Sequence, residues 1–192
     1  MDIGTESDLL GDEEEEGPLD VEEAIEETER ITVFELGGES YGVPVMEVDQ
    51  VVRTSPLTRV PRTAAAIDGI IDIRGAITVV INPWVHLDLP TDPRPWERQL
   101  VVGFQTADGE QSVGLRIDQI VGVEPIPVSQ VDYDDPGDTP NGDSPLVEGV
   151  ARRVDDDEVV DRIGLLDTDA TVSIAGQHPH ITDGGSDATA DD

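Results

Sequence analysis

Short runs of β-branched residues alternate with turn residues along most of the chain, which is the pattern of an all-β protein. The longest run, IDGIIDIRGAITVVIN at 67–82, indicates two strands that meet at a tight corner. Its isoleucines and valines suit a pleated and largely buried surface. Gly69 and Gly75 mark places where the backbone bends or approaches a neighbour. We therefore expect a buried hairpin with one cation, Arg74, at its corner.

Similar runs occur on both sides of this hairpin. A first strand is predicted from Ile31, followed by a turn at Gly37-Gly38, a return strand at 41–45 and a further strand that begins at Val48. In the second half, strands are predicted at 100–104 and 112–117, on either side of a turn at 108–109. The proline-, aspartate- or glycine-rich stretches are expected to be connections; they are 53–66, 83–98 and 129–144.

Three segments of the first half recur in the second half. V-D-Q-V-V at 48–52 matches I-D-Q-I-V at 117–121, I-D-G-I at 67–70 matches V-E-G-V at 147–150, and Y-G-V at 41–43 matches V-G-L at 113–115. A unit of about 70 to 80 residues buries a limited core on its own. We therefore expect two small barrels that share an apolar seam. Their predicted limits are 31–98 and 99–172, with room for an exchange of terminal strands.

The two ends of the chain differ in composition from this domain. Residues 1–30 contain the acidic block 13–16 and no basic residue before Arg30, and residues 173–192 are polar and rich in glycine and aspartate. Both compositions are typical of disordered tails. The sequence thus predicts one domain at 31–172 between two acidic tails.

The charge of the chain limits its partners. Its 192 residues carry a formal net charge of −33, from 44 acidic and 11 basic residues, and every basic residue is arginine. This charge argues against binding to nucleic acid or to an anionic membrane surface, since both would be repelled. An acid excess without lysine favours adaptation to a salty cytoplasm, such as that of a haloarchaeon, where salt screens the repulsion.

Several kinds of chemistry have no support in the sequence. Without cysteine there is no disulfide, zinc–thiolate site or thiol nucleophile. His178, His180 and Asp183 offer metal-binding groups, but they lie in the C-terminal tail without supporting residues, so neither a metal nor another cofactor is predicted. No phosphate-binding loop or catalytic triad is present. We expect a protein that is not an enzyme.

No segment is predicted to enter a membrane. No apolar run approaches the roughly 20 residues that span a bilayer. The N-terminus is acidic and lacks the basic region of a signal peptide. A cytoplasmic location without membrane insertion is expected.

The repeat and three motifs together resemble the CheW-like family of chemotaxis coupling proteins. The motifs are F-x-L-G-x-x-x-Y-G-V at 34–43, G-x-x-x-x-R-G at 69–75, and G-φ-x-φ-D-x-φ-x-x-V at 114–123, where φ is apolar. The resemblance covers about 31–171. It implies an all-β fold in which two five-stranded SH3-like barrels, related by a pseudo-two-fold axis, pack as one CheW-like domain.

The resemblance also implies a function and a site. It implies a scaffold in a two-component system, which links the cytoplasmic tip of a methyl-accepting receptor to the regulatory domain of the histidine kinase CheA. The receptor would bind at the seam between the barrels, and the kinase would bind the outer surface of the first barrel. Arg74 matches the arginine of the family's N-L-R-G corner, and Val48, Gln50 and Val51 match the strand that faces the receptor.

The chain departs from the family pattern in four places. Asp72 replaces the usual asparagine before the corner, and Gln50 stands where glutamate is frequent. I-N-P-W at 81–84 replaces V-D-L-R, and the family's C-terminal amphipathic helix is not convincing after Leu166. These departures affect the expected receptor contacts rather than the fold.

Other interpretations remain open at this point. The chain is alternatively a small acidic β-barrel enzyme or metal-binding protein, or a CheW-like module of another signalling array. Arg74 itself has two roles open to it. It is either a recognition residue on a rigid corner or a turn residue that reaches solvent or pairs with Asp72.

The charge leads to a first testable expectation, that folding depends on salt. At about 0.1 M salt the Debye length is roughly 10 Å, so neighbouring surface carboxylates still repel one another. We expect the melting temperature measured by circular dichroism to rise between low and multimolar KCl. An unchanged melting temperature across that range would contradict this expectation.

Overall fold

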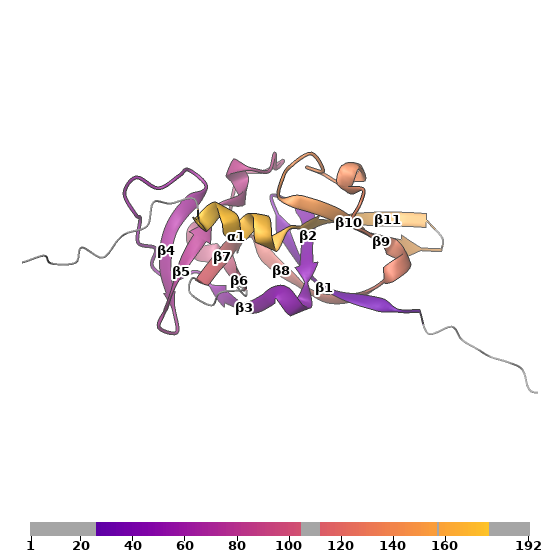
Figure 1. Cartoon of the computed structure of the whole chain (residues 1–192), viewed down its shortest axis with the longest axis horizontal. Coiled ribbons are helices and arrows are strands. Elements are labelled where there is room, and N and C mark those ends of the chain that lie inside the picture. Colours follow the sequence, from indigo (N-terminus) through magenta and orange to yellow (C-terminus); the bar gives the residue numbers. More distant parts are fainter. Residues whose placement is uncertain (1–25, 105–111, 157, 177–192) are drawn as a thin grey trace, which may run out of the picture.

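The computed structural model describes residues 26–104, 112–156 and 158–176, and within them the chain is mainly β-structure (Figure 1). Its regular elements are β1 (Thr28–Leu36), β2 (Glu39–Pro44), β3 (Val48–Arg53), β4 (Ile67–Ile73), β5 (Ala76–Ile81), β6 (Leu100–Phe104), β7 (Ser112–Ile117), β8 (Gln119–Pro127), β9 (Val131–Asp132), β10 (Val147–Asp155), β11 (Glu158–Leu166) and α1 (Thr168–Gly176). The predicted all-β class is confirmed. Most of the predicted tails lies outside the described residues.

The strands form two sheets. Sheet A has the order β8-β1-β2-β11-β10-β9, and sheet B has the order β3-β6-β7-β5-β4. The sheets therefore do not follow the limits 31–98 and 99–172. The first hairpin, β1–β2, joins four strands of the second half, and the hairpin β6–β7 joins three strands of the first half. Each barrel is built by exchange of a hairpin between the repeats.

The predicted pseudo-two-fold repeat is confirmed by the pairing of strands. The order β8-β1-β2-β11-β10 corresponds strand for strand to β3-β6-β7-β5-β4. Each set contains three antiparallel pairs and one parallel pair, and the parallel pair is β2 with β11 in sheet A and β7 with β5 in sheet B. The two barrels thus share one topology.

Residue pairing confirms two of the three sequence correspondences. The segments 41–43 and 113–115 are equivalent, and so are 67–70 and 147–150, because their glycines lie in matching rows. One row runs Gly42–Leu165–Gly149 across sheet A, and the other runs Gly114–Val80–Gly69 across sheet B.

The third correspondence is wrong by three residues. Val48 pairs with Phe104 of β6, and the residue that pairs with Phe34 of β1 is Ile120. Residues 48–50 are therefore equivalent to 120–122, not to 117–119. The shared D-Q letters are accidental, since Asp118 lies between β7 and β8 and not on a strand.

The main core lies at the seam between the barrels, as predicted. Side chains of β1, β2, β6 and β7 supply most of it, so each exchanged hairpin packs against the other; members include Phe34, Leu36, Tyr41, Val43, Val102, Phe104, Val113, Leu115 and Ile117. Two smaller clusters fill the barrels of sheet A and sheet B. Because both barrels bury apolar surface in one shared core, they stabilise each other.

Helix α1 corrects the expectation that no convincing helix follows Leu166. The Asp167 side chain accepts a hydrogen bond of 2.8 Å from the Ala170 amide, which caps the helix N-terminus. The helix follows β11 of sheet A and packs across the seam on β5 and β7 of sheet B (Figure 1). Its β-branched residues have low helix propensity, so tertiary packing, with Ala175 buried in the main core, decides its structure.

Gly69 provides a test of the register in sheet B. It has φ 151°, and a Cβ at this position would lie 2.4 Å from the carbonyl oxygen of Thr58. Gly75, in the same hairpin, has φ 87° and open space around it. We expect Gly69→Ala to lower the free energy of unfolding by about 3 kcal/mol, through backbone strain and a steric clash. Gly75→Ala, which adds strain alone, should cost about 1 kcal/mol.

Chemical denaturation of both variants measures the difference. Equal losses of stability would show that the loop carrying Thr58 does not pack on β4 as described.

Candidate partner-binding site

Arg74 lies at the two-residue turn between β4 and β5. Arg74 has φ 54° and Gly75 has φ 87°, the pair of positive values found in a type I′ hairpin turn. The Asp72 carboxylate accepts a hydrogen bond of 2.8 Å from the Gly75 amide. The turn is therefore held by its own residues, and the Arg74 side chain is exposed at its end.

Within the turn, Asp72 has a structural contact, whereas the Arg74 side chain takes no part in the described contacts that hold the turn. Asp72 is engaged by the backbone, and none of the ion pairs among the described residues includes Arg74. A non-glycine residue with positive φ costs about 1 kcal/mol. The chain thus keeps a strained, exposed arginine at a position where the described residues form no ion pair with it.

The other predicted contact residues lie on β3, the edge strand of sheet B. Burial alternates along this strand, with Val48 and Gln50 half-buried and Val51 exposed. Val48 packs against the main core, and Gln50 lies over Gly103. Of these three side chains, Val51 therefore offers the most surface to a partner.

Arg74 and Val48 lie at the same end of sheet B but on opposite edges. Phe104 pairs with Val48 on one side and with Val113 on the other, and Val113 pairs with Val79 of β5. The turn at Arg74 lies a few residues beyond Val79. The connection 105–111, which joins β6 to β7 at this end, lies outside the described residues.

Sequence reasoning missed two exposed apolar side chains near this end. Met46, just before β3, is 81% exposed, and Ile77, just after the Arg74 turn, is 58% exposed. Large exposed apolar side chains often mark interaction surfaces. The correct repeat register would have drawn attention to Met46, since its equivalent in the second half is Asp118, which is 3% exposed.

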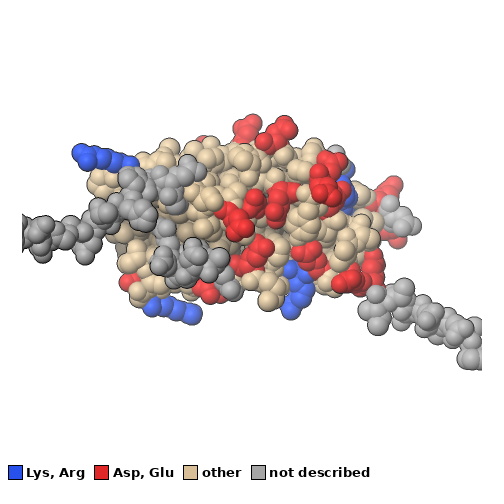
Figure 2. Space-filling view, in the orientation of Figure 1, with Lys and Arg blue, Asp and Glu red and all other residues tan. Residues whose placement is uncertain are grey.

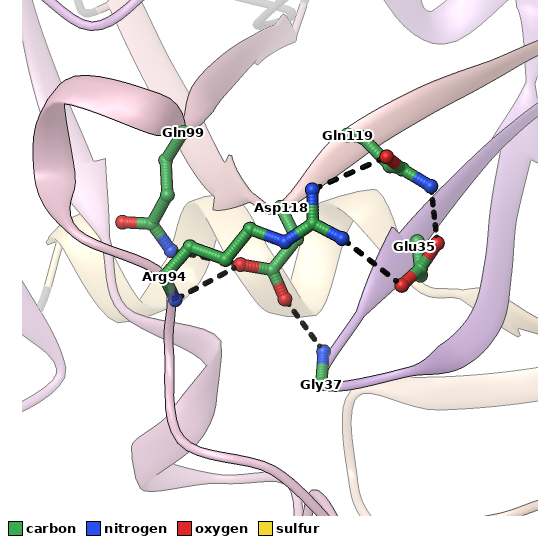
Figure 3. Close-up of polar contacts among 6 residues, drawn as sticks. All are labelled: Glu35, Gly37, Arg94, Gln99, Asp118 and Gln119. Carbon is green, nitrogen blue, oxygen red and sulfur yellow. Dashed lines mark hydrogen bonds and ion pairs between the residues drawn. The ribbon is translucent and has the colours of Figure 1, made fainter.

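The chain passes between the sheets at two crossovers, the first between β2 and β3 and the second between β7 and β8, and Asp118 lies at the second. Its carboxylate accepts hydrogen bonds from the Gly37 amide at 2.9 Å, from the Arg94 amide at 3.2 Å and from the Gln99 side chain at 3.2 Å (Figure 3). Its own amide donates to the carbonyl of Glu35. The aspartate of the 114–123 motif is thus a structural residue that joins the β1–β2 turn to the connection before β6.

An exposed layer covers this buried carboxylate. The Arg94 guanidinium donates to Gln119 at 3.2 Å and contacts Glu35 at 3.5 Å, and the Gln119 amide also donates to Glu35 (Figure 3). Because these side chains are partly in water, each contact contributes little alone. Asp118 itself is 3% exposed.

Arg116 explains the departure at 81–84. Its guanidinium pairs with Asp68 at 2.8 Å, donates to the Asn82 side chain at 2.8 Å and lies 5.0 Å from the ring centroid of Trp84. The contact with Asp68 is close in distance, although it lacks the direction of a hydrogen bond. Asn82 and Trp84 therefore hold an arginine that the sequence analysis did not single out.

Burial shifts the pKa values of this pair. Desolvation raises the pKa of Asp68, against the lowering by the charges of Arg116 and Arg59, and it lowers the pKa of Arg116 against the charge of Asp68. The pair is consequently a structural link between β4 and β7 with little exposure to a partner.

The surface charge is uneven. On the face shown in Figure 2, acidic side chains gather over sheet A and the start of α1, and fewer lie over sheet B. Burial, followed by the charges of Asp167 and Glu47, raises the pKa of Glu148 to about 7. The sheet B end is therefore the less repulsive face for an acidic partner.

The described part of the chain offers neither a metal site nor a membrane-spanning helix. It contains no cluster of three acidic or histidine side chains placed to hold a metal ion. No helix there has the length and hydrophobicity to cross a membrane. His178, His180 and Asp183 lie outside the described residues.

Comparisons with known proteins agree with this geometry. The family model described as the CheW-like domain matches residues 30–175. A chemotaxis protein CheW of Treponema pallidum is 29% identical over 126 residues, which cover 65% of this chain and 73% of that protein. One of Helicobacter pylori is 24% identical over 148 residues, which cover 77% and 87%.

A solved structure agrees as well. The crystal structure of the scaffolding protein TtCheW of Thermoanaerobacter tengcongensis superposes with a TM-score of 0.60 at 28% identity, over 73% of this chain and 84% of that one.

Replacing Asp118 tests the crossover network. Asp118→Asn removes a charge and turns an amide donor toward groups that are themselves donors, so we expect the free energy of unfolding to fall by about 2–3 kcal/mol. Asp49→Asn, at an exposed position on β3, is the matched control and should change stability little. Chemical denaturation measures both, and equal stabilities would remove Asp118 from its structural role.

Proposed function

The chain belongs to the family of CheW-like domains, and on that premise we propose which of its surfaces perform the family's task. The protein is a chemotaxis adaptor that couples receptors to the histidine kinase CheA. We propose the residues that contact the methyl-accepting receptor, the surface that contacts the kinase, and the part of the chain that is required.

The receptor-binding residue with the strongest support is Arg74. Its backbone is fixed by the turn, and Asp72 is engaged by Gly75. A guanidinium held in this way loses little entropy on binding. Its planar fork fits a carboxylate or the carbonyl groups at a helix end on the cytoplasmic tip of the receptor. The single observation that carries the proposal is this exposed arginine on a strained and internally closed turn.

Strand β3, at the same end of sheet B but on its opposite edge, supplies an apolar part of the receptor-binding surface in this proposal. Val51 is exposed and contacts the receptor directly in this proposal, while Val48 and Gln50 support the strand from its inner side. Met46 extends the apolar surface beyond the strand. In this proposal the regulatory domain of CheA binds the outer surface of the first barrel, the one that contains strands β3 to β5, at a place other than the Arg74 turn.

Coupling of this kind requires binding surfaces and no catalytic group. We therefore propose that the protein is not an enzyme and works in the cytoplasm, where the receptor tip and the kinase meet. We also propose residues 31–172 as the unit that carries this function. Helix α1, which ends at Gly176, would complete that unit, because it packs across the seam.

Arg74→Ala separates recognition from structure. We expect the affinity for a receptor cytoplasmic fragment to fall by about 1–3 kcal/mol, the cost of losing a charge-assisted hydrogen bond. The melting temperature should hardly change, because none of the described contacts depends on the guanidinium. Calorimetry at a salt concentration at which both proteins are folded measures the affinity.

Arg30→Ala is the control for this experiment. Arg30 is an exposed arginine on β1 of sheet A, and its replacement should leave affinity unchanged. A loss of stability in Arg74→Ala with unchanged affinity of the folded protein would remove Arg74 from the site.

A further inference from the structure

The few arginines of this chain are unevenly distributed. Residues 48–98 contain six of the 11 arginines and six acidic residues, so this segment is neutral in a chain with a net charge of −33. Within it, residues 50–67 contain three arginines and no acidic residue. A local excess of positive charge in so acidic a chain calls for a physical explanation.

The loop that follows β3 lies along the outer edge of sheet B. Thr58 and Ile70 exchange two backbone hydrogen bonds of 2.9 Å, so the loop runs antiparallel to β4. It carries Arg59 next to the pairing point and Arg62 further along. The turn with Arg74 lies at the other end of β4. These three residues, Arg59, Arg62 and Arg74, are called the arginine edge below.

All three side chains are exposed, and none takes part in an ion pair among the residues that the structure describes. The charge of Arg59 opposes the rise that burial causes in the pKa of Asp68. Asp68, however, already pairs with Arg116. Arg94, Arg116, Arg152 and Arg153, by contrast, each have a carboxylate partner. The arginine edge therefore keeps its positive charge available.

The backbone is strained at two of these three positions. Arg62 has φ 66° and Arg74 has φ 54°, whereas glycine or asparagine adopts such values more readily. Strain that persists at exposed turns is a reason to look for a function of the side chain. Here the same residue type stands at both strained turns of one sheet edge.

We propose that the arginine edge binds an acidic segment of the receptor's cytoplasmic tip, so that Arg59 and Arg62 extend the contact made by Arg74. This inference rests on the function proposed above. At about 3.4 Å per residue, the edge from the level of Arg62 to Arg74 is on the order of 20 Å long, which fits several acidic side chains of one segment.

Charge complementarity favours an acidic receptor segment as the partner of the arginine edge. An acidic partner is repelled by the acid-rich surface over sheet A and is attracted where positive charge is unpaired (Figure 2). The edge therefore sets the orientation in which a partner approaches, in addition to adding contacts. An acidic tail of the chain itself is the competing occupant, and the experiment separates the two.

The experiment compares charge-removing variants of the full chain. Arg59→Gln, Arg62→Gln and the double variant are tested against Arg30→Gln, the same change at an exposed arginine of sheet A. Binding of a receptor cytoplasmic fragment is measured by calorimetry at several salt concentrations at which both proteins are folded. Melting temperatures confirm that the variants fold.

We expect the double variant to bind about fivefold more weakly at the lowest of these salt concentrations, the scale of exposed charge pairs. The salt dependence of its binding constant should also be shallower, because fewer charges are paired on binding. Arg30→Gln should bind like the original chain.

Two results would overturn the inference. Equal binding by the double variant, Arg30→Gln and the original chain would show that the edge makes no contact. Tighter binding by the double variant would show that the edge holds an acidic tail of the chain itself. If the original chain fails to bind the receptor fragment at all, the proposed function fails, and that outcome is distinct from both.

Discussion

The buried carboxylate of Asp118 fixes the point at which the chain passes from sheet B to sheet A. β7 belongs to one sheet and β8 to the other, and Asp118 is the residue between them. It holds the β1–β2 turn through Gly37 and the connection before β6 through Arg94 and Gln99. A buried charge is tolerated only with several hydrogen bonds, so these three segments must meet at one place. The hydrogen bonds that Asp118 requires therefore fix how these segments meet at the seam between the barrels.

The two crossovers are equivalent in topology and different in chemistry. The first crossover, between β2 and β3, carries exposed Met46 where the second carries buried Asp118. Glu47, next to Met46, accepts a hydrogen bond from Thr168 at the start of α1. The second crossover thus buries a hydrogen-bonded carboxylate, whereas the first exposes an apolar side chain to solvent. The repeat preserves the path of the chain, while the side chains at its two crossovers differ in chemistry and burial.

The sequence predicted what local patterns decide and missed what tertiary contacts decide. The hairpin corner at Arg74, the two barrels and the matching glycine rows follow from β-branched runs and from glycines that neighbouring strands require. The correspondence predicted for 48–52 was wrong because it relied on a shared Asp-Gln pair. Strand pairing sets the true correspondence, and no local sequence pattern shows strand pairing. Helix α1 and the contacts of Arg116 were missed because their partners are distant in sequence. Whether Arg74, Val48, Gln50 and Val51 bind the receptor stays a prediction.

The exchange of hairpins has a consequence for synthesis on the ribosome. β1 pairs with β2 early, but its other neighbour, β8, begins at Gln119, and β2 must wait for β11. Sheet B can pair all five of its strands once β7 has emerged. By contrast, Ile31 and Val33 of β1 pack against residues of β8, β10 and β11, so they stay uncovered until nearly the whole domain has been made. Contacts between residues this distant in sequence slow folding and leave apolar surface exposed until folding is complete. The β1–β2 hairpin therefore forms first, but its packing is completed last. A high density of like charge is one physical means of keeping incomplete chains apart until then.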